Sequence, residues 1–337
     1  MSEPYITDWN KYVFGNESST FAHQIEWLEI LRRSFGHKPV YLLALEGEKI
    51  TGILPMILKS SLIFGKFIVS LPWLDYGGIC ADSPQACSIL LEKAVKIAKA
   101  ERCEFLELRG ITLIDYPMVS KTNKVSFFLD LDPKYESVWR KIDPKARNQV
   151  RKAEKSGLEI LFGEKELLDE FYHVFSHNMR DLGTPVWSKK LFENILLFFP
   201  QKSEIALVKL RAQTIGGALI LYFKDRMIIP SASSLKQFLS YCPNNLLYWE
   251  SIKRAIGMGL KKFDFGRSTL NSGTYHFKKQ WVKDHTQLYW QYYLNRPGEL
   301  PEMNPENPKY RFWIKMWQKL PLSFTNFLGP KISRNLP

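Results

Sequence analysis

The sequence predicts an α/β protein in which one mixed unit of helices and strands occurs twice. Three observations predict this class. The 337 residues are enough for two domains of ordinary size. The composition, 45% hydrophobic and 24% charged, is that of a globular protein. The order of predicted elements in the first half recurs in the second, at a period too long for a solenoid, which favours duplication of one domain.

The first half opens with a segment in which apolar residues recur three or four positions apart, as in an amphipathic helix. Two strands joined by a tight turn at Gly47 follow. A loop then leads to a helix, whose Pro84 suits the first helical turn, and to one more strand. In order, these are helix 20–35, strands 40–45 and 49–58, the loop at Tyr76-Gly77-Gly78, helix 84–100 and strand 104–109.

The second half repeats this order after a helical region. Strands come first, then a helix, then a last strand that follows the helix directly. In order, these are the helical region 164–200, strands 204–210, 214–223 and 226–233, helix 244–258 and strand 262–265.

Matching residues support the duplication. Each half has a glycine-containing start to one strand, a Leu-Leu pair in the helix and a strand that ends in arginine. The corresponding segments are residues 50–52 and 215–217, residues 90–91 and 246–247, and residues 105–109 and 263–267. We therefore expect two domains, each a mixed, mostly antiparallel sheet flanked by helices. We place the first at residues 1–131 and the second at residues 132–299, followed by a basic, aromatic tail at 300–337.

The chain carries no pattern of export. Its N-terminus lacks a signal-peptide pattern, and no apolar run approaches the ~20 residues that a membrane-spanning helix needs. The four cysteines are scattered, without the spacing of a disulfide framework or a zinc site. These features predict a cytoplasmic protein with no metal site, with a peripheral position at the inner membrane as the alternative.

The net charge of +13 favours an anionic partner. Nucleic acid, phospholipid headgroups and phosphorylated small molecules all fit this charge. The charge alone does not choose among them.

A basic segment between the two halves concentrates part of this charge. In residues 145–157, Arg147, Arg151 and Lys155 are spaced four apart, which places three cations on one helical stripe. A solvated helix face and a contact to phosphate groups are both open interpretations.

The strand around Asp264 and the segment after it form the second candidate. The strand carries Asp264 between Phe263 and Phe265, which places the carboxylate on the opposite face of the sheet. An aromatic and basic segment, residues 273–281, follows a loop. A lysine in such a place can stabilise a developing oxyanion during acyl transfer, whereas an amphipathic turn is the plainer interpretation.

Two further segments carry weaker signals. Residues 180–185 read as a helix stop with Gly183 as its cap. His173 and His177 have the spacing of a zinc pair but lack the glutamate between them, so ordinary helix residues are favoured.

The tail has a helix-like segment at residues 311–320. Its apolar side chains gather on one side, and its cations lie largely on the other. The sequence leaves two interpretations open, docking on the body of the protein and contact with a membrane interface.

Together, these segments resemble the FemAB family of aminoacyl and peptidyl transferases. The resemblance rests on KARNQVRKAEKSG (145–157), FDFGRS (263–268) and GTYHFKKQW (273–281). It is closest to FemAB-like proteins associated with exosortase and exopolysaccharide systems, in which RDLGTP (180–185) and LPWLDYGG (71–78) also recur. The resemblance covers roughly residues 20–294 and implies two tandem GNAT-like domains. It also implies transfer of an aminoacyl group, from aminoacyl-tRNA in well-studied members, to an amine of a peptidoglycan precursor.

The resemblance assigns roles to individual residues. Lys278 is the expected catalytic residue, which stabilises the tetrahedral intermediate while the amine attacks the ester directly. The expected substrate-binding residues are two arginines that face phosphates, four that line a cleft, and two more from the same motifs. They are Arg147, Arg151, Asp181, Thr184, Arg267, Tyr275, Asp264 and Tyr76. The sequence departs from the family at Val282, where glycine is often found, and residues 132–157 are predicted as one helix without a coiled-coil arm.

Three functions follow from the sequence. The leading one is transfer of an aminoacyl or acyl group to a cell-envelope or exopolysaccharide-related precursor, without a tightly bound cofactor. The second is an acyl-CoA-dependent N-acyltransferase, which normally needs a glycine-rich helix start for the pyrophosphate. Residues 81–90 and 240–246, where that start is expected, contain no glycine. The third is a basic scaffold that binds nucleic acid or membrane without catalysis. For the two transferase functions, the sequence leaves the donor undecided between aminoacyl-tRNA and acyl-CoA.

Overall fold

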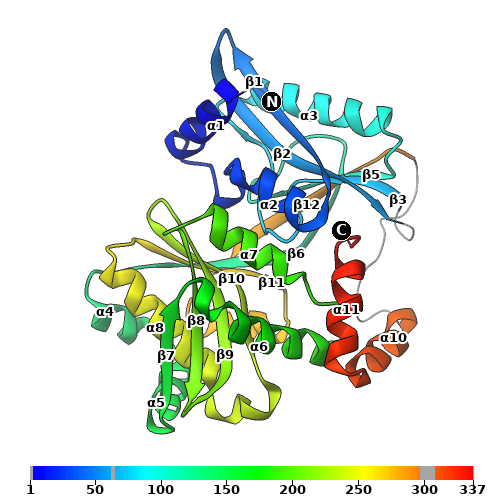
Figure 1. The fold of residues 1–337 in the computed structure, drawn as a ribbon. Helices are drawn as coiled ribbons and strands as arrows, with labels where there is room; N and C mark the ends of the chain where they lie inside the picture. Colours follow the sequence, from blue (N-terminus) through cyan, green and yellow to red (C-terminus); the bar gives the residue numbers. More distant parts are fainter. Residues whose placement is uncertain (1–2, 62–64, 297–307, 337) are drawn as a thin grey trace. The chain divides into compact units, whose positions relative to one another are not determined.

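The computed structural model describes residues 3–61, 65–296 and 308–336, and the chain divides into two compact units (Figure 1). Unit 1 takes in the described residues up to Lys124, those from Gln287 to Arg296, and those from Asn335. Unit 2 takes in Val125–Thr286 and the described residues from Pro308 to Arg334. The division expected from the sequence lies at 131/132, with residues 132–299 in the second domain. The structure instead returns a late strand to unit 1, because it pairs antiparallel with a strand there.

Unit 1 is a mixed sheet with helices on both faces. Its strands lie in the order β1-β2-β3-β5-β12, and β4 pairs with β2. All these neighbours are antiparallel except β3 and β5, which are parallel. The elements are α1 (Glu3–Gly15), η1 (Phe21–His23), α2 (Glu26–Phe35), β1 (Lys38–Glu46), β2 (Lys49–Ser61), β3 (Gly65–Val69), β4 (Cys80–Ala81), α3 (Pro84–Ala100), β5 (Phe105–Gly110) and β12 (Thr286–Leu294). Strand β6 (Val119–Asp130) contributes residues to both units.

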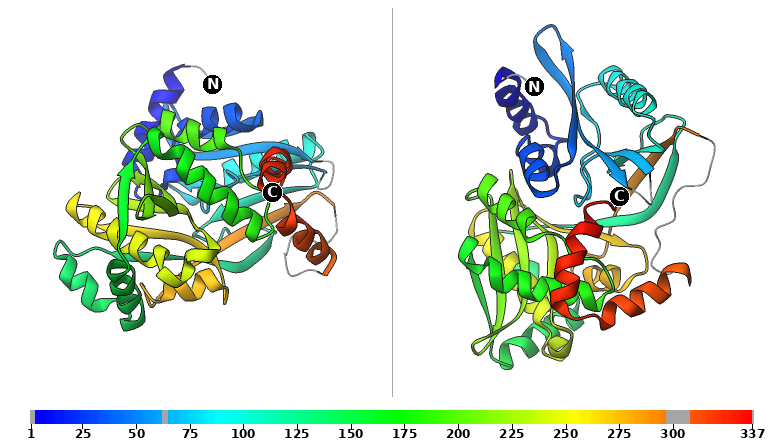
Figure 2. Two further views of the ribbon diagram at one scale, coloured as in Figure 1. Left: turned by 60° about the horizontal axis from the view of Figure 1, so that its bottom comes forward. Right: turned by 45° about the vertical axis from the view of Figure 1, so that its right-hand side comes forward.

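Helix α3 covers one face of this sheet. It contacts β1, β2 and β5, and Leu90 and Leu91 are buried in the cluster that they share. A Cβ atom at Gly52 of β2 would lie 2.9 Å from Leu90 Cδ1, so glycine is needed for this close approach. The helices α1 and α2 contact β2 and β1 (Figure 2).

Unit 2 has the same plan. Its strands lie in the order β6-β11-β10-β9-β8-β7, antiparallel from β7 to β10 and parallel between β10 and β11. The elements are α4 (Tyr135–Lys141), α5 (Pro144–Lys155), β7 (Leu158–Gly163), η2 (Lys165–Leu167), α6 (Leu168–Asp181), α7 (Lys189–Phe198), β8 (Ser203–Leu210), β9 (Gln213–Phe223), β10 (Arg226–Ser234), η3 (Lys236–Tyr241), α8 (Pro243–Gly257), β11 (Lys262–Thr269), α9 (Gly273–Lys279), α10 (Pro308–Lys319) and α11 (Leu322–Ser333). The predicted fold class, two mixed sheets flanked by helices, is confirmed.

The two faces of the unit 2 sheet bury different helices. Leu246, Ile252 and Ala255 of α8 join the main core cluster with buried residues of α5. On the other face, a Cβ atom at Gly217 would meet the ring of Phe171 on α6, which shows how closely α6 lies on β9. Helix α7 packs beside α6 through Phe192 (Figure 1).

Two helix predictions are wrong. Residues 20–35 do not form one helix, because the backbone N–H of Thr20 donates to Nδ1 of His23 and closes a single turn, after which Gln24 is extended. Residues 132–157 form α4 and α5 rather than one helix. Pro144 disfavours helical backbone at the residue before it, and Asp143 caps α5 by accepting from the N–H of Lys145.

No helix within residues 3–61, 65–296 and 308–336 has the length and apolar content needed to cross a bilayer.

Candidate active site and ligand cavity

Strands β10 and β11 run side by side only at their beginnings. Their paired residues are Arg226–Ile228 and Lys262–Asp264, although β10 continues to Ser234 and β11 to Thr269. Pro230 lies where β10 changes register against β9, and it has no N–H to donate. A parallel pair that separates in this way offers backbone groups to an extended ligand, as in strand addition.

A buried polar cluster lies on β11 just beyond the last paired residue. Gly266 has a φ of 68°, and its N–H donates to Oδ1 of Asp264 at 2.8 Å. The hydroxyl of Ser126 donates to the same oxygen at 3.3 Å. The ammonium of Lys278, on α9, donates to the carbonyl oxygens of Gly266 at 2.8 Å and Arg267 at 2.7 Å. The structure thus brings together the side chains of Asp264 and Lys278 and the main-chain carbonyl of Arg267, three residues of the predicted set.

Both titratable side chains of this cluster are buried. The side chains of Asp264 and Lys278 belong to residues only 1% and 7% exposed. Lys278 lies on helix α9. Ser272 caps the start of this helix, because its hydroxyl accepts from the N–H of Tyr275. A fixed ammonium in such surroundings interacts more strongly with a developing negative charge than it would in water.

Tyr275 takes part in the core rather than in this cluster. Its ring lies 5.5 Å from that of Phe127 and 5.7 Å from that of His285, and the residue is 7% exposed. Through these ring contacts, Tyr275 packs α9 against β6.

Arg147 and Arg151 lie on α5, apart from the contacts of the Lys278 cluster. Arg151 donates to Asn148 at 3.2 Å and lies over the ring of Trp139, and its side chain is exposed. Arg147 is half-buried, and its buried Nε has no hydrogen-bond partner among the described residues. The other face of α5 is held by Ala146, Val150 and Ala153 in the core.

Asp181 and Thr184 lie where α6 ends. Asp181 forms an ion pair of 2.9 Å with Arg180. Gly183 has a φ of 75°, and the N–H of Thr184 donates to the carbonyl of Met179. The predicted helix stop is therefore present, and it also receives helix α10, whose Gln318 donates to the carbonyl of Asp181.

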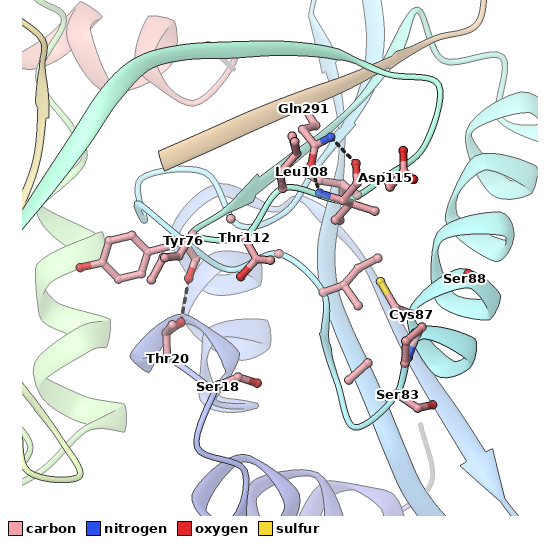
Figure 3. Close-up of a pocket in the computed structure, with 18 of the residues that line it drawn as sticks. Ser18, Thr20, Tyr76, Ser83, Cys87, Ser88, Leu108, Thr112, Asp115 and Gln291 are labelled. Carbon is pink, nitrogen blue, oxygen red and sulfur yellow. Dashed lines mark hydrogen bonds between the residues drawn. The ribbon is translucent and has the colours of Figure 1, made fainter. Parts of the chain in front are cut away.

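Unit 1 contains a cavity of about 490 Å³, which lies between its loops and the start of α3 (Figure 3). Tyr76 is among the lining residues, and its carbonyl accepts from the hydroxyl of Thr20 at 2.7 Å. In Figure 3 the ring of Tyr76 points away from Cys87 and Ser83, so its backbone is the part that shapes this wall. Gln291 bonds to both the N–H and the carbonyl of Ile114, at 2.8 Å each, and fixes the opposite wall.

The lining of this cavity is mixed, because apolar side chains such as Ile79, Leu108 and Leu113 lie beside carboxylates. Asp82 and Asp115 contribute them, and Ser83 and Ser88 add hydroxyl groups. Burial raises the pKa of the Cys87 thiol, so this cysteine is not an activated nucleophile. The cavity therefore offers both apolar and polar groups to a ligand and no activated thiol.

The sequence does not predict this cavity, because its walls come from four separate stretches of chain. Of the lining residues, Tyr76 is expected to bind substrate by resemblance, and Gly78 has a structural reason to be glycine. A Cβ atom there would lie 2.8 Å from the carbonyl oxygen of Arg109, so a glycine is required where two backbones meet.

Among the described residues, no group of three or more His, Cys, Asp and Glu side chains is placed to hold a metal ion.

The class of protein is indicated by a domain match and by similar solved structures. Residues 140–279 match the acetyltransferase (GNAT) domain family, and this range includes the separated strands, α9 and Lys278. A comparison with curated protein sequences gave no match.

The solved structures that are similar extend this result to both units. FemX is 15% identical with a TM-score of 0.65, and the likeness covers 87% of this chain and 96% of that chain. A tandem GNAT protein from the clavulanic acid biosynthesis pathway is 7% identical with a TM-score of 0.56, covering 88% and 97%. The C-terminal domain of a putative lysylphosphatidylglycerol synthetase from Agrobacterium fabrum is 11% identical with a TM-score of 0.60, covering 85% and 90%. The chain therefore has a tandem GNAT fold. The domain match over residues 140–279 supports an acyltransferase in general.

Proposed function

We propose that this chain is a FemAB-like transferase, which moves an aminoacyl or acyl group onto an amine of a cell-envelope or exopolysaccharide-related precursor. The observation that carries the proposal is the position of Lys278. Its ammonium is held by two backbone carbonyls on β11, next to the point where β10 and β11 separate, within the GNAT-matched range.

The proposed chemistry needs no protein nucleophile. The acceptor amine attacks the carbonyl carbon of the donor, a C–N bond forms, and negative charge develops on the carbonyl oxygen. The Lys278 ammonium stabilises that charge. The C–O bond of an ester donor, or the C–S bond of a thioester, then breaks, and the proton lost by the amine neutralises the leaving group.

The proposed donor is an aminoacyl-tRNA, with Arg147 and Arg151 facing its phosphates. The net charge of +13 and the exposed cations of α5 support a large anionic donor. One of the similar structures belongs to a putative lysylphosphatidylglycerol synthetase, a name that describes aminoacyl transfer to a lipid.

An acyl-CoA donor is the second candidate, favoured by the match to an acetyltransferase domain. Equilibrium binding of charged tRNA, uncharged tRNA and acetyl-CoA to the full chain separates the two. The proposal expects charged tRNA to bind at least ~10-fold more tightly than uncharged tRNA. Tight binding of acetyl-CoA alone would establish the second candidate.

The same binding experiment with Lys278→Met tests whether Lys278 acts in catalysis rather than in donor binding. This variant should bind the donor as the wild type does, because the lysine acts on charge that appears only in the transition state. If no donor binds to either protein, the transferase proposal is wrong and a scaffold function takes its place.

A further inference from the structure

Helices α10 and α11 dock on unit 2 through one face each (Figures 1 and 2). Gln318 of α10 donates to the carbonyl of Asp181 at 2.9 Å, and Ile314 packs on Gly183. On α11, Ser333 donates to the carbonyl of Val186 at 3.0 Å. These contacts fix which side of each helix faces the protein.

The sides that do not dock carry large apolar residues. Each is about half to two-thirds exposed, although residues of this type are normally buried. They are Phe312 at 62%, Trp313 at 68% and Met316 at 47% on α10, with Phe324 at 48% and Phe327 at 65% on α11. Docking on the protein does not account for them, because a different face of each helix already makes the docking contacts.

Cations accompany these apolar residues. From residue 307 to residue 337 the sequence has no Asp or Glu and six Lys or Arg. Arg311, Lys315 and Lys319 are exposed and spaced four apart, so they form a stripe along α10 beside Phe312 and Met316. On α11, the ammonium of Lys331 lies 3.9 Å from the centre of the Phe327 ring.

We propose that this apolar and basic surface of α10 and α11 binds an anionic phospholipid bilayer. Aromatic and apolar side chains enter the interface between headgroups and acyl chains, while the cations meet the acidic headgroups. Contact with RNA would use the cations but would leave Met316 and the phenylalanines unexplained. A second copy of the chain would bring two surfaces of the same charge together.

Vesicle co-sedimentation of the full chain tests this proposal without any assay of transfer. The vesicles are phosphatidylcholine alone, or phosphatidylcholine with 30% phosphatidylglycerol, a probe composition of about one anionic lipid in three. We expect binding to the anionic vesicles, weakened at high salt, and at least ~10-fold weaker binding for Phe312→Ser/Trp313→Ser/Met316→Ser. Replacing Arg311, Lys315 and Lys319 by Gln should weaken it by roughly 100-fold, at about 5-fold for each cation.

Two matched variants serve as controls. Leu197→Ser/Leu239→Ser/Met258→Ser removes three comparably exposed apolar residues elsewhere in unit 2. Lys93→Gln/Lys96→Gln/Lys99→Gln removes three exposed cations from α3. Both should bind vesicles as the wild type does.

Three outcomes would overturn the proposal. The first is no binding to anionic vesicles, and the second is equal binding by the α10 variants and their controls. The third is that the α10 substitutions leave vesicle binding intact but abolish another interaction. That interaction is either tRNA binding or dimer formation, which light scattering detects. Thermal unfolding of each variant checks that it is folded.

Discussion

Lys278 is the single residue on which the proposed chemistry depends. Lys278→Met removes the buried ammonium and leaves the carbonyls of Gly266 and Arg267 without that donor. We expect single-turnover transfer to fall at least ~100-fold, the size of effect seen when one oxyanion donor is lost. Some loss of stability is also expected, about 1–3 kcal/mol for an unsatisfied buried group.

The two effects are separable. Denaturant unfolding gives the fraction of folded Lys278→Met, and the transfer rate is then expressed per folded molecule. If the rate per folded molecule equals that of the wild type, the lysine only holds β11 and α9 together. The role assigned to it by family resemblance would then be wrong.

His177 gives a pH-dependent prediction at the same scale. Burial, with the nearby His173 and Arg180, lowers the pKa of His177 below its ordinary value of 6.5. The unfolded chain therefore binds this proton more readily than the folded chain does. The stability contributed by the neutral ring is present above pH 6.5 and is lost as the pH falls through that value toward the folded pKa.

The free energy of unfolding, measured from pH 8 to pH 5, checks this sign. His177→Gln cannot take up the proton in either state, so its stability should fall less steeply below pH 6.5 than that of the wild type. His276→Gln, in α9, is the control. Identical slopes for His177→Gln and the wild type would contradict the prediction.

At the scale of elements, the docking of α10 depends on Gly183. A Cβ atom at Gly183 would clash with Ile314. The φ of Gly183 is 75°, which disfavours any residue other than glycine at this position. Gly157 is a matched control, because its φ is 73° and nothing lies within 4 Å of an added Cβ. Both Gly→Ala variants should lose about 1–2 kcal/mol to backbone strain, and only Gly183→Ala should also loosen α10.

Limited trypsin digestion measures that difference. Cleavage after Lys315 and Lys319 should be faster in Gly183→Ala than in Gly157→Ala, because a helix without its docking contacts unfolds locally more often. Equal cleavage rates would show that Ile314 moves aside and that the contact does not hold the helix.

Elements with strong local signals could be predicted closely. Pro84 and the apolar spacing after it predicted α3, which runs from Pro84 to Ala100 as expected. Strands β8, β9 and β10 lie within two residues of their predicted bounds, because each is an apolar run between turns. Strands β3, β6, β7 and β12 were not predicted. Strand β6 begins with exposed polar residues, and β12 is stabilised by pairing with a strand far away in sequence.

The same distinction applies to the candidate site. Motif resemblance singled out Asp264, Arg267 and Lys278. In the structure, the side chains of Asp264 and Lys278 and the main-chain carbonyl of Arg267 lie in one cluster. No local pattern shows that β10 and β11 separate after Asp264, because the pairing joins two strands that are far apart in sequence. The unit 1 cavity depends on chain segments far apart, so only the tertiary fold reveals it.

For the whole molecule, the remaining question is whether the net charge of +13 or a local site binds the anionic donor. Arg147→Gln/Arg151→Gln and Lys93→Gln/Lys96→Gln each remove two positive charges. If binding reflects overall charge, the two variants bind tRNA alike. If α5 is the site, only the arginine variant should lose affinity, and its slope of log K against log salt should shrink by about 1.4–1.8.

Titration of tRNA from 50 to 200 mM salt measures these slopes. The local site is expected, because Arg147 and Arg151 share one helical stripe with Lys155, so their potentials add over one helix face. The α3 lysines carry the same formal charge, but they lie on a different unit. Parallel salt dependences for both variants and the wild type would remove α5 from the donor site and leave the charge of the protein as a general attraction for anions.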